Sequence, residues 1–218
     1  MNPPPIVAAL FVDPRGPYAS LEGVDPWPAE RDARTYSGPH PVVVHPPCER
    51  WGRYARGGPS ARRTYLLGDD DGCFASGLDS VRRWGGVLEH PEGSHAWDRF
   101  GIKRPWGDAT GWRTADALGG FTCRVDQGHY GHPARKATWL YVYGVPQALL
   151  PDLRWDRFTG GRRLDAGFHS AEERAFAVAS GLAPTRDRGR LTKSERIHTP
   201  VPFRDILLAI ARSARPRA

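Results

Sequence analysis

Four residues of this chain carry side chains that could act together in covalent chemistry: Cys48, Glu89, Arg135 and Lys136. A thiolate is a nucleophile. A carboxyl group can exchange a proton with a ring nitrogen, and a cation lowers the pKa of a thiol and binds anionic oxygens. This set is typical of attack on a polarised heteroaromatic ring. We predict that Cys48 is the nucleophile, that Glu89 binds the ring edge, and that Arg135 or Lys136 orients the substrate.

The position of Cys48 follows from the residues before it. Val42 to Val44 form a β-branched run that is typical of a buried strand. Pro46 and Pro47 then stop the pairing of that strand and fix the backbone. The sequence therefore presents Cys48 at the carboxyl end of a central strand, where ligands bind in open α/β sheets.

The remaining pattern predicts short strands that alternate with helical segments, which favours an α/β fold with a mostly parallel central sheet. We expect one catalytic domain over 1–214, with a loop-rich insertion at 146–190 and a tail at 215–218. The predicted strands are 6–12, 24–25, 42–44, 87–89, 121–126 and 137–144, and the predicted helical segments are 30–36, 69–84, 170–180 and 202–214.

Composition limits the class of protein. A net charge of +7 and a pI of about 9.7 favour a polyanionic partner, with nucleic acid first, although a basic chain can also be merely soluble. The three cysteines are too few and too scattered for a disulfide scaffold, and we expect Cys73 and Cys123 to be structural. The sequence shows no signal peptide pattern and no apolar run long enough to span a bilayer, so we expect a cytoplasmic protein.

Two histidine spacings could supply half of a metal site: His45-x-x-Cys48 and His129-x-x-His132. The chain lacks the paired Cys-x-x-Cys, and the combined motifs of zinc deaminases, that would complete such a site. We predict no metal, and we expect His45 and His132 to line a pocket or to bind backbone groups.

Short motifs, in order, resemble those of the DNA cytosine-5 methyltransferases. Together they cover about a third of the chain. They are Pro46-Pro47-Cys48 at the nucleophile loop, Leu88-Glu89-His90-Pro91 at the glutamate motif, the stretch from Tyr130 to Gly144 at the Tyr-Gly-x-Pro motif with its following strand, His198-Thr199-Pro200-Val201-Pro202 before the last helix, and Phe11 within the first predicted strand.

The resemblance implies a trimmed Rossmann-like methyltransferase fold and a covalent mechanism on DNA. Cys48 would add to C6 of a cytosine flipped from its stack, Glu89 would contact the ring nitrogen and the exocyclic amine, and C5 would take a methyl group from S-adenosylmethionine. The implied cofactor-binding residues are Phe11, Asp13, Gly16, Asp25, Thr199 and Val201. The implied substrate-binding residues are Pro46, Pro47, Trp51, Arg53, His90, Tyr130 and His132.

Other functions fit the same residues. The span 146–190 is too short for a large target-recognition domain, so the substrate could be small or single-stranded. The thiol could serve another one-carbon donor on DNA or on a pyrimidine nucleotide. The basic and aromatic loop between Trp51 and Tyr65 could stack bases and neutralise phosphates, which also fits a catalytically silent nucleic-acid-binding protein.

Overall fold

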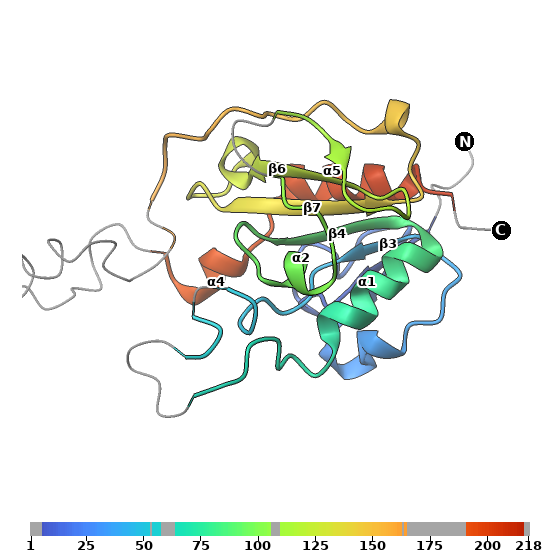
Figure 1. The fold of residues 1–218 in the computed structure, drawn as a ribbon, viewed down its shortest axis with the longest axis horizontal. Coiled ribbons are helices and arrows are strands. Elements are labelled where there is room, and N and C mark those ends of the chain that lie inside the picture. Colours follow the sequence, from blue (N-terminus) through green and yellow to red (C-terminus); the bar gives the residue numbers. More distant parts are fainter. Residues whose placement is uncertain are drawn as a thin grey trace, which may run out of the picture.

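A computed structural model describes residues 6–52, 54–57, 64–105, 110–162, 164 and 191–215. These residues form one seven-stranded sheet with helices on both faces, which confirms the predicted α/β class (Figure 1). The predicted helix at 170–180 and the side chain of Arg53 lie outside the described residues.

The sheet has the order β2-β1-β3-β4-β7-β6-β5. Strands β2, β1, β3 and β4 are parallel, whereas β7 and the hairpin partners beyond it pair antiparallel. The bounds are β1 (Val7–Leu10), β2 (Val24–Trp27), β3 (Val42–Val44), β4 (Gly86–Pro91), β5 (Arg113–Thr114), β6 (Phe121–Asp126) and β7 (Ala137–Tyr143).

The sheet is therefore mixed, and the prediction of a mostly parallel sheet holds only for its β2-β1-β3-β4 half. The physical reason is the length of the connection between β6 and β7. Ten residues join these strands, enough for a hairpin, whereas a parallel pair needs a crossover that usually contains a helix.

Helices cover the two faces of the sheet with different side chains. Helices α1 and α2 pack on one face, and α5 packs on the other (Figure 1). The bounds are α1 (Cys73–Trp84), α2 (Ala96–Arg99), α4 (Lys193–Ile197) and α5 (Val201–Arg212), with 3-10 turns η1 (Ala29–Arg31), η2 (Ala33–Thr35), η3 (Gln127–Tyr130) and η4 (Gln147–Leu149).

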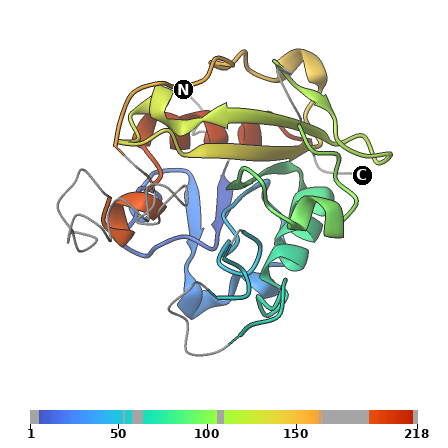
Figure 2. The ribbon, with the colours of Figure 1, turned by 60° about the vertical axis from the view of Figure 1, so that its left-hand side comes forward.

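Helix α1 lies close to the sheet because a glycine faces β3. A Cβ atom at Gly77 would come 2.7 Å from Cγ1 of Val44. Asp70 caps the start of this helix by accepting hydrogen bonds from the backbone N–H groups of Gly72 and Phe74. The twist of the sheet, visible in Figure 2, sets β1 and β3 at a steep angle to β6 and β7.

Most predicted elements are found in place. The predicted strands at 24–25, 42–44, 87–89, 121–126 and 137–144 correspond to β2, β3, β4, β6 and β7, and the segment 30–36 folds as the two 3-10 turns η1 and η2. The span 93–120, which has no clean periodicity, contains the short α2 and β5. Among the described residues, no helix combines the length and the apolar character needed to cross a bilayer.

Candidate functional site

At the carboxyl end of β4, the face of the sheet that packs against α5 carries polar side chains in place of apolar ones. Along each strand, alternate residues face α5. On this face Val43 is followed by His45, Val87 by Glu89, and Val125 by Gln127, and Thr138 precedes Leu140 on the antiparallel β7. The same alternation that builds the core therefore brings these polar groups to one edge.

These side chains form one chain of hydrogen bonds. His45 Nδ1 lies 2.9 Å from Glu89 Oε2, and His45 Nε2 lies 2.9 Å from the Tyr18 hydroxyl. Gln127 Nε2 donates to Glu89 Oε1 at 3.1 Å and to the Thr138 hydroxyl at 2.9 Å. Because an ionised carboxylate only accepts, we assign the proton between His45 and Glu89 to Nδ1.

Glu89 is ionised although it is only 8% exposed. Burial raises the pKa of its carboxyl group, but the hydrogen bond from His45 and the charges of Lys136, His45 and His90 outweigh burial and lower that pKa to about 2. At neutral pH, Glu89 is a fixed anion with both oxygens engaged.

Cys48 and Lys136 act electrostatically on each other, and both interact with the charge of Glu89, so the three groups lie near one another at one edge of the sheet. Burial raises the pKa of the Cys48 thiol and the charge of Glu89 raises it further, while the Lys136 ammonium opposes both. Burial lowers the pKa of Lys136, against the opposing effect of Glu89 and Cys48. The resting thiol is therefore mostly protonated, beside a cation that favours its thiolate.

Helix α4 holds Lys136 in this position. The Lys136 ammonium donates to the carbonyl of His198 at 2.8 Å and to the carbonyl of Ile197 at 3.3 Å, both at the end of α4. Lys136 has a left-handed backbone with φ of 41°, a conformation that costs on the order of 1–3 kcal/mol outside glycine. The packing around the β6–β7 connection compensates for this cost and fixes the cation near Cys48.

Arg135 does not join the Cys48, Glu89 and Lys136 cluster. Its guanidinium binds Glu92 at 3.0 Å and lies 3.9 Å from Asp126, in a network that also contains Arg124. Of the two adjacent cations that the sequence offers for orienting a substrate, the structure brings only Lys136 to the thiol.

His90, predicted to bind substrate, lies on the opposite face of β4 from Glu89. Its ring packs edge-on against Phe74 and stacks on Trp97, and its Nδ1 lies 2.8 Å from the Ser94 hydroxyl. The reason is the period of a strand: a residue next to one that faces α5 must face α1. His90 therefore contributes to the core beneath the site and not to a substrate surface.

The neutral state of His90 makes stability sensitive to acid. Burial lowers the pKa of His90 to about 4, against the opposing charge of Glu89. The unfolded chain binds this proton below its ordinary pKa near 6.5, so the free energy of unfolding should fall as pH drops from about 6.5 to 4, by roughly 3 kcal/mol at most.

Urea unfolding as a function of pH measures this effect. His90→Phe keeps the ring packing and removes the titration, so we expect its stability to stay flat over this window. If the free energy of unfolding of His90→Phe fell with pH as steeply as that of the wild type, the acid sensitivity would not come from His90.

Trp51 of the predicted base-stacking loop is not available as a stacking surface. Trp51 is 4% exposed, packs on Phe74 and Phe100, and donates from Nε1 to Asp70 at 2.8 Å. Its ring belongs to the core, because the loop folds back onto the start of α1. Arg53 lies outside the described residues.

The other predicted substrate residues divide between the loop of the thiol and the scaffold. Pro46 is buried and Pro47 is exposed beside Cys48. The Tyr130 hydroxyl accepts from the backbone N–H of Arg154, and its ring packs on Phe203. His132 is buried, with Nε2 lying 3.1 Å from the carbonyl of Glu195, so it ties the β6–β7 connection to α4.

The residues predicted to hold the cofactor are scattered or already engaged. Asp25 lies within β2, where one carboxylate oxygen binds Arg31 and the other accepts from Trp27 Nε1. Asp13 caps a turn through the backbone N–H of Arg15. Phe11, with φ of 57°, is half-buried against the α1 face, Thr199 is buried, and Val201 is exposed at the start of α5.

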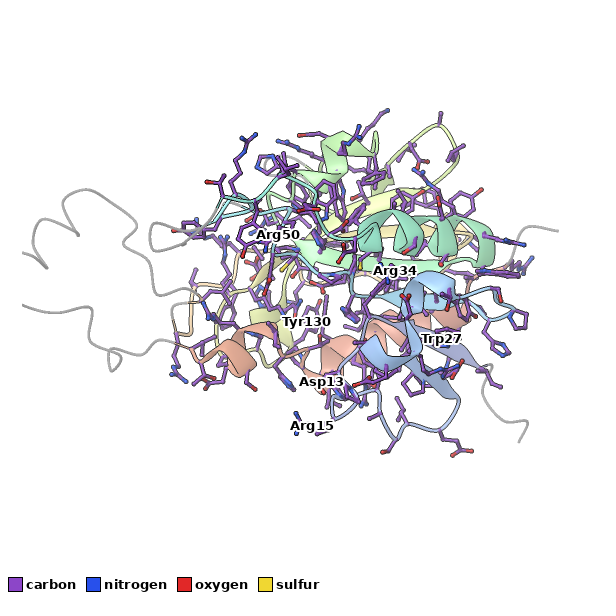
Figure 3. The ribbon with its side chains drawn as sticks, turned by 90° about the horizontal axis from the view of Figure 1, so that it is seen from below. Asp13, Arg15, Trp27, Arg34, Arg50 and Tyr130 are labelled. Atoms are coloured by element: carbon purple, nitrogen blue, oxygen red, sulfur yellow. The ribbon has the colours of Figure 1, made fainter. Side chains whose placement is uncertain are left out.

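An open hollow of about 440 Å³ lies along the loop between β1 and β2. Gly16, Arg15 and Arg204 of α5 line it, together with Pro14, Pro17, Ala19, Ser20 and Leu21. Arg15 points outward from this loop in Figure 3, whereas Tyr18 turns inward to His45. The hollow therefore lies outside the Cys48, Glu89 and Lys136 cluster, and the same loop buries Tyr18, which is 2% exposed, against His45 just past β3.

These residues do not fit S-adenosylmethionine as the resemblance implies. The acid that would bind the ribose is already paired with Arg31, the loop that would approach the ligand carries Pro14 and Pro17, and the same loop packs Tyr18 against His45 at the end of β3.

Sequence reasoning assigned no site role to Tyr18 and Gln127, and it assigned His45 only to a pocket lining or to backbone contacts. The signal for His45 and Gln127 was present, because each continues the α5-facing alternation one step past an apolar residue. No local signal marks Tyr18, which reaches His45 across 27 residues of chain.

Comparison of the chain with protein-family models, with curated proteins and with solved structures gives no match.

Proposed function

We propose that this protein is a nucleic-acid base-modifying enzyme in which Cys48 bonds covalently to C6 of a pyrimidine and thereby activates C5 for transfer of a one-carbon group. The observation that carries the proposal is the position of Glu89 at the end of β4, on the carboxyl edge of β3 and β4, hydrogen-bonded to His45 and Gln127, with Cys48 and Lys136 from two other segments near enough to interact with its charge. This edge adjoins the point between β1 and β3 where the strand order reverses, which is the usual ligand position in such sheets.

Each group has one role in the proposed reaction. The Cys48 sulfur bonds to C6 and the C5=C6 electron pair moves into the ring, so that C5 becomes nucleophilic. Glu89 holds the ring nitrogen and the exocyclic amine. C5 then attacks the carbon of an electrophilic one-carbon donor, and the bond between that carbon and its carrier breaks, so that the carrier leaves with the electron pair. Loss of the C5 proton to solvent and departure of the thiolate restore the aromatic ring. Lys136 stabilises the thiolate as it forms and as it leaves.

The proposed partner is DNA. A net charge of +7 supports a polyanionic partner. The loop that follows Cys48 carries Arg50 with its guanidinium 3.5 Å from the centre of the Tyr65 ring, and exposed Tyr54 and Arg56. Aromatic rings interleaved with cations suit single-stranded or flipped bases.

Nucleoside mass spectrometry tests the proposal. DNA from cells that express the protein should contain a modified pyrimidine that is absent from cells expressing Cys48→Ala. If the purified protein retains DNA but neither host DNA nor free pyrimidine nucleotides become modified, the protein is a catalytically silent nucleic-acid-binding protein on this scaffold, and the proposal fails.

S-adenosylmethionine supplies a methyl group in the family that the chain resembles, and calorimetry tests whether it binds here. We expect no saturable heat when it is titrated into the protein, because Asp25 is paired with Arg31 and Tyr18 is buried against His45 at the end of β3. Titration of a DNA oligonucleotide into the same sample serves as the positive control. Saturable binding with one site per chain would contradict this expectation and would make a methyl group the transferred unit.

A further inference from the structure

The hydrogen-bond chain behind Glu89 ends in a histidine and a tyrosine that the proposed reaction has not used. His45 bridges Glu89 Oε2 and the Tyr18 hydroxyl, with 2.9 Å on either side. Tyr18 is 2% exposed and cannot meet a substrate. Both ring nitrogens of His45 are occupied, Nδ1 by Glu89 and Nε2 by Tyr18. Both residues therefore act on the substrate through Glu89.

The protonation state of Glu89 creates a need for such a partner. Addition of a thiolate to C6 drives negative charge onto the pyrimidine ring, and a proton at the ring nitrogen relieves it. Because its pKa is about 2, Glu89 holds no proton of its own near neutral pH. A neighbouring group must supply one through the carboxylate.

We propose that His45 stores the proton that Glu89 passes to the ring nitrogen, and that Tyr18 keeps His45 in place in both of its charge states. Imidazole is the side chain that most readily changes charge near neutral pH. This inference rests on the function proposed above and deepens it, since it assigns the proton source of the same site.

The step balances in atoms and charge. The Cys48 sulfur bonds to C6, the C5=C6 pair moves into the ring, and the ring nitrogen takes a proton from Glu89. Glu89 takes the Nδ1 proton of the His45 imidazolium, so that Glu89 ends ionised and His45 ends neutral. When the thiolate leaves, the ring nitrogen returns its proton along the same path.

Tyr18 can form a hydrogen bond with His45 before and after the proton transfer, because a hydroxyl can donate or accept. It accepts from Nε2–H when His45 is an imidazolium, or when the neutral ring carries its proton on Nε2. It donates to Nε2 when the neutral ring carries its proton on Nδ1. Burial, followed by the charge of Glu89, raises the pKa of Tyr18 well above its usual value, so the hydroxyl keeps its own proton throughout.

Several elements contribute charged groups around the hydrogen bonds that join Tyr18, His45 and Glu89. Glu89 of β4 faces His45 directly. Lys136 and Cys48 act on Glu89 from the β6–β7 connection and from the loop after β3, and Arg204 and Asp205 of α5 act on Tyr18. After the hydrogen bond from His45, the charge of Lys136 is the largest effect that lowers the pKa of Glu89.

The test uses the full chain and a single-stranded DNA oligonucleotide containing 5-azacytosine, whose electron-poor ring accepts a thiolate at C6. The measured quantity is the rate of the covalent complex across pH 5 to about 10. His45→Asn places an amide nitrogen near the Nδ1 position, so it can still donate to Glu89 but cannot supply a proton. His95→Asn, at an exposed histidine, is the matched control.

The wild type should give a bell-shaped profile, because the thiolate forms on one limb and the imidazolium is lost on the other. His45→Asn should bind the oligonucleotide and melt as the wild type does. Its rate should fall about a hundredfold, with a profile that only rises with pH. Tyr18→Phe should shift the falling limb without removing it.

Two results would overturn the inference. If His45→Asn keeps the rate and the falling limb while Cys48→Ser abolishes the complex, His45 is not the proton store and the proposed function stands. If the wild type forms no complex with this oligonucleotide at any pH, the proposed function fails and the inference fails with it. If His45→Asn melts at a lower temperature than the wild type, the pH profile of Tyr18→Phe becomes the test. A falling limb at the same pH as in the wild type would then reject the proton relay.

Discussion

Replacement of Cys48 by serine should abolish the covalent complex with the 5-azacytosine oligonucleotide, with a loss of at least about a thousandfold in rate. A serine hydroxyl stays protonated across the accessible pH range and is a weaker nucleophile than a thiolate. Denaturing electrophoresis and the mass of the intact complex measure the bond directly. The melting temperature should change little, because the Cys48 side chain is only partly buried.

Cys73→Ser is the matched control for this loss. Cys73 is also partly buried, and burial also raises its pKa, but it begins α1 on the other face of the sheet. Its replacement should leave the complex intact. If Cys48→Ser still formed a denaturant-resistant complex, or if only Cys73→Ser lost the complex, Cys48 would not be the nucleophile.

The environment of Cys48 allows a second experiment, which measures the reactivity of its thiol. Lys136 is the group that opposes burial and the charge of Glu89 at the thiol. Lys136→Gln should therefore raise the pKa of Cys48 further, and alkylation of that thiol by iodoacetamide should slow near neutral pH. Arg135→Gln should leave this rate unchanged, because Arg135 binds Glu92 and not the thiol.

Loss of the Glu89 carboxylate should lower both activity and stability. Glu89→Ala leaves the donors of His45 and Gln127 without their buried acceptor. A buried donor without a partner costs about 1–3 kcal/mol, and removal of one member of a buried charged pair costs about 3–5 kcal/mol. We expect a loss of roughly 3 kcal/mol in the free energy of unfolding at pH 7, and a fall of at least about a hundredfold in the rate of the covalent complex.

The stability loss should depend on pH with a defined sign. The pKa of Glu89 is lower in the folded protein, about 2, than its ordinary value of 4.5. Its contribution to stability is therefore fully present above about 4.5 and is lost as pH falls toward about 2. The difference between wild type and Glu89→Ala in urea unfolding should shrink over this window, which lies mostly below the window of His90.

Glu92→Gln is the control for this experiment, because Glu92 is an exposed acid three residues further along the chain. It binds Arg124 and Arg135 at the surface, where such pairs contribute about 0–1 kcal/mol. A Glu89→Ala protein as stable as Glu92→Gln at pH 7 would mean that the His45 and Gln127 bonds do not hold the site.

The local pattern of the sequence was enough to predict every strand except β5, and the edge of the sheet that carries Cys48 and Glu89. A β-branched run closed by Pro-Pro defines β3, the apolar pair Val87-Leu88 marks β4, and the alternation along β4 places Glu89 on one face and His90 on the other. That alternation was available before the structure, and its use would have removed His90 from the predicted substrate residues. The same rule would have added Gln127, two residues after Val125.

Contacts between segments far apart in the sequence could not be predicted in this way. The sequence offered two adjacent cations, and only the left-handed backbone at Lys136 and the carbonyls of α4 select one of them for the thiol. Trp51 appeared in a basic loop, yet the loop folds back and buries its ring against Phe74.

The sequence by itself determined the α/β class, the short strands and the edge that presents a thiol and a carboxylate. It did so because strand propensity, turn residues and the two-residue alternation act over a few neighbouring positions. The tertiary structure alone decided that β7 enters antiparallel, that Lys136 and not Arg135 lies near Cys48, and that Tyr18 packs against His45. Those outcomes depend on which distant surfaces exclude water together, and no local pattern in the chain encodes that choice.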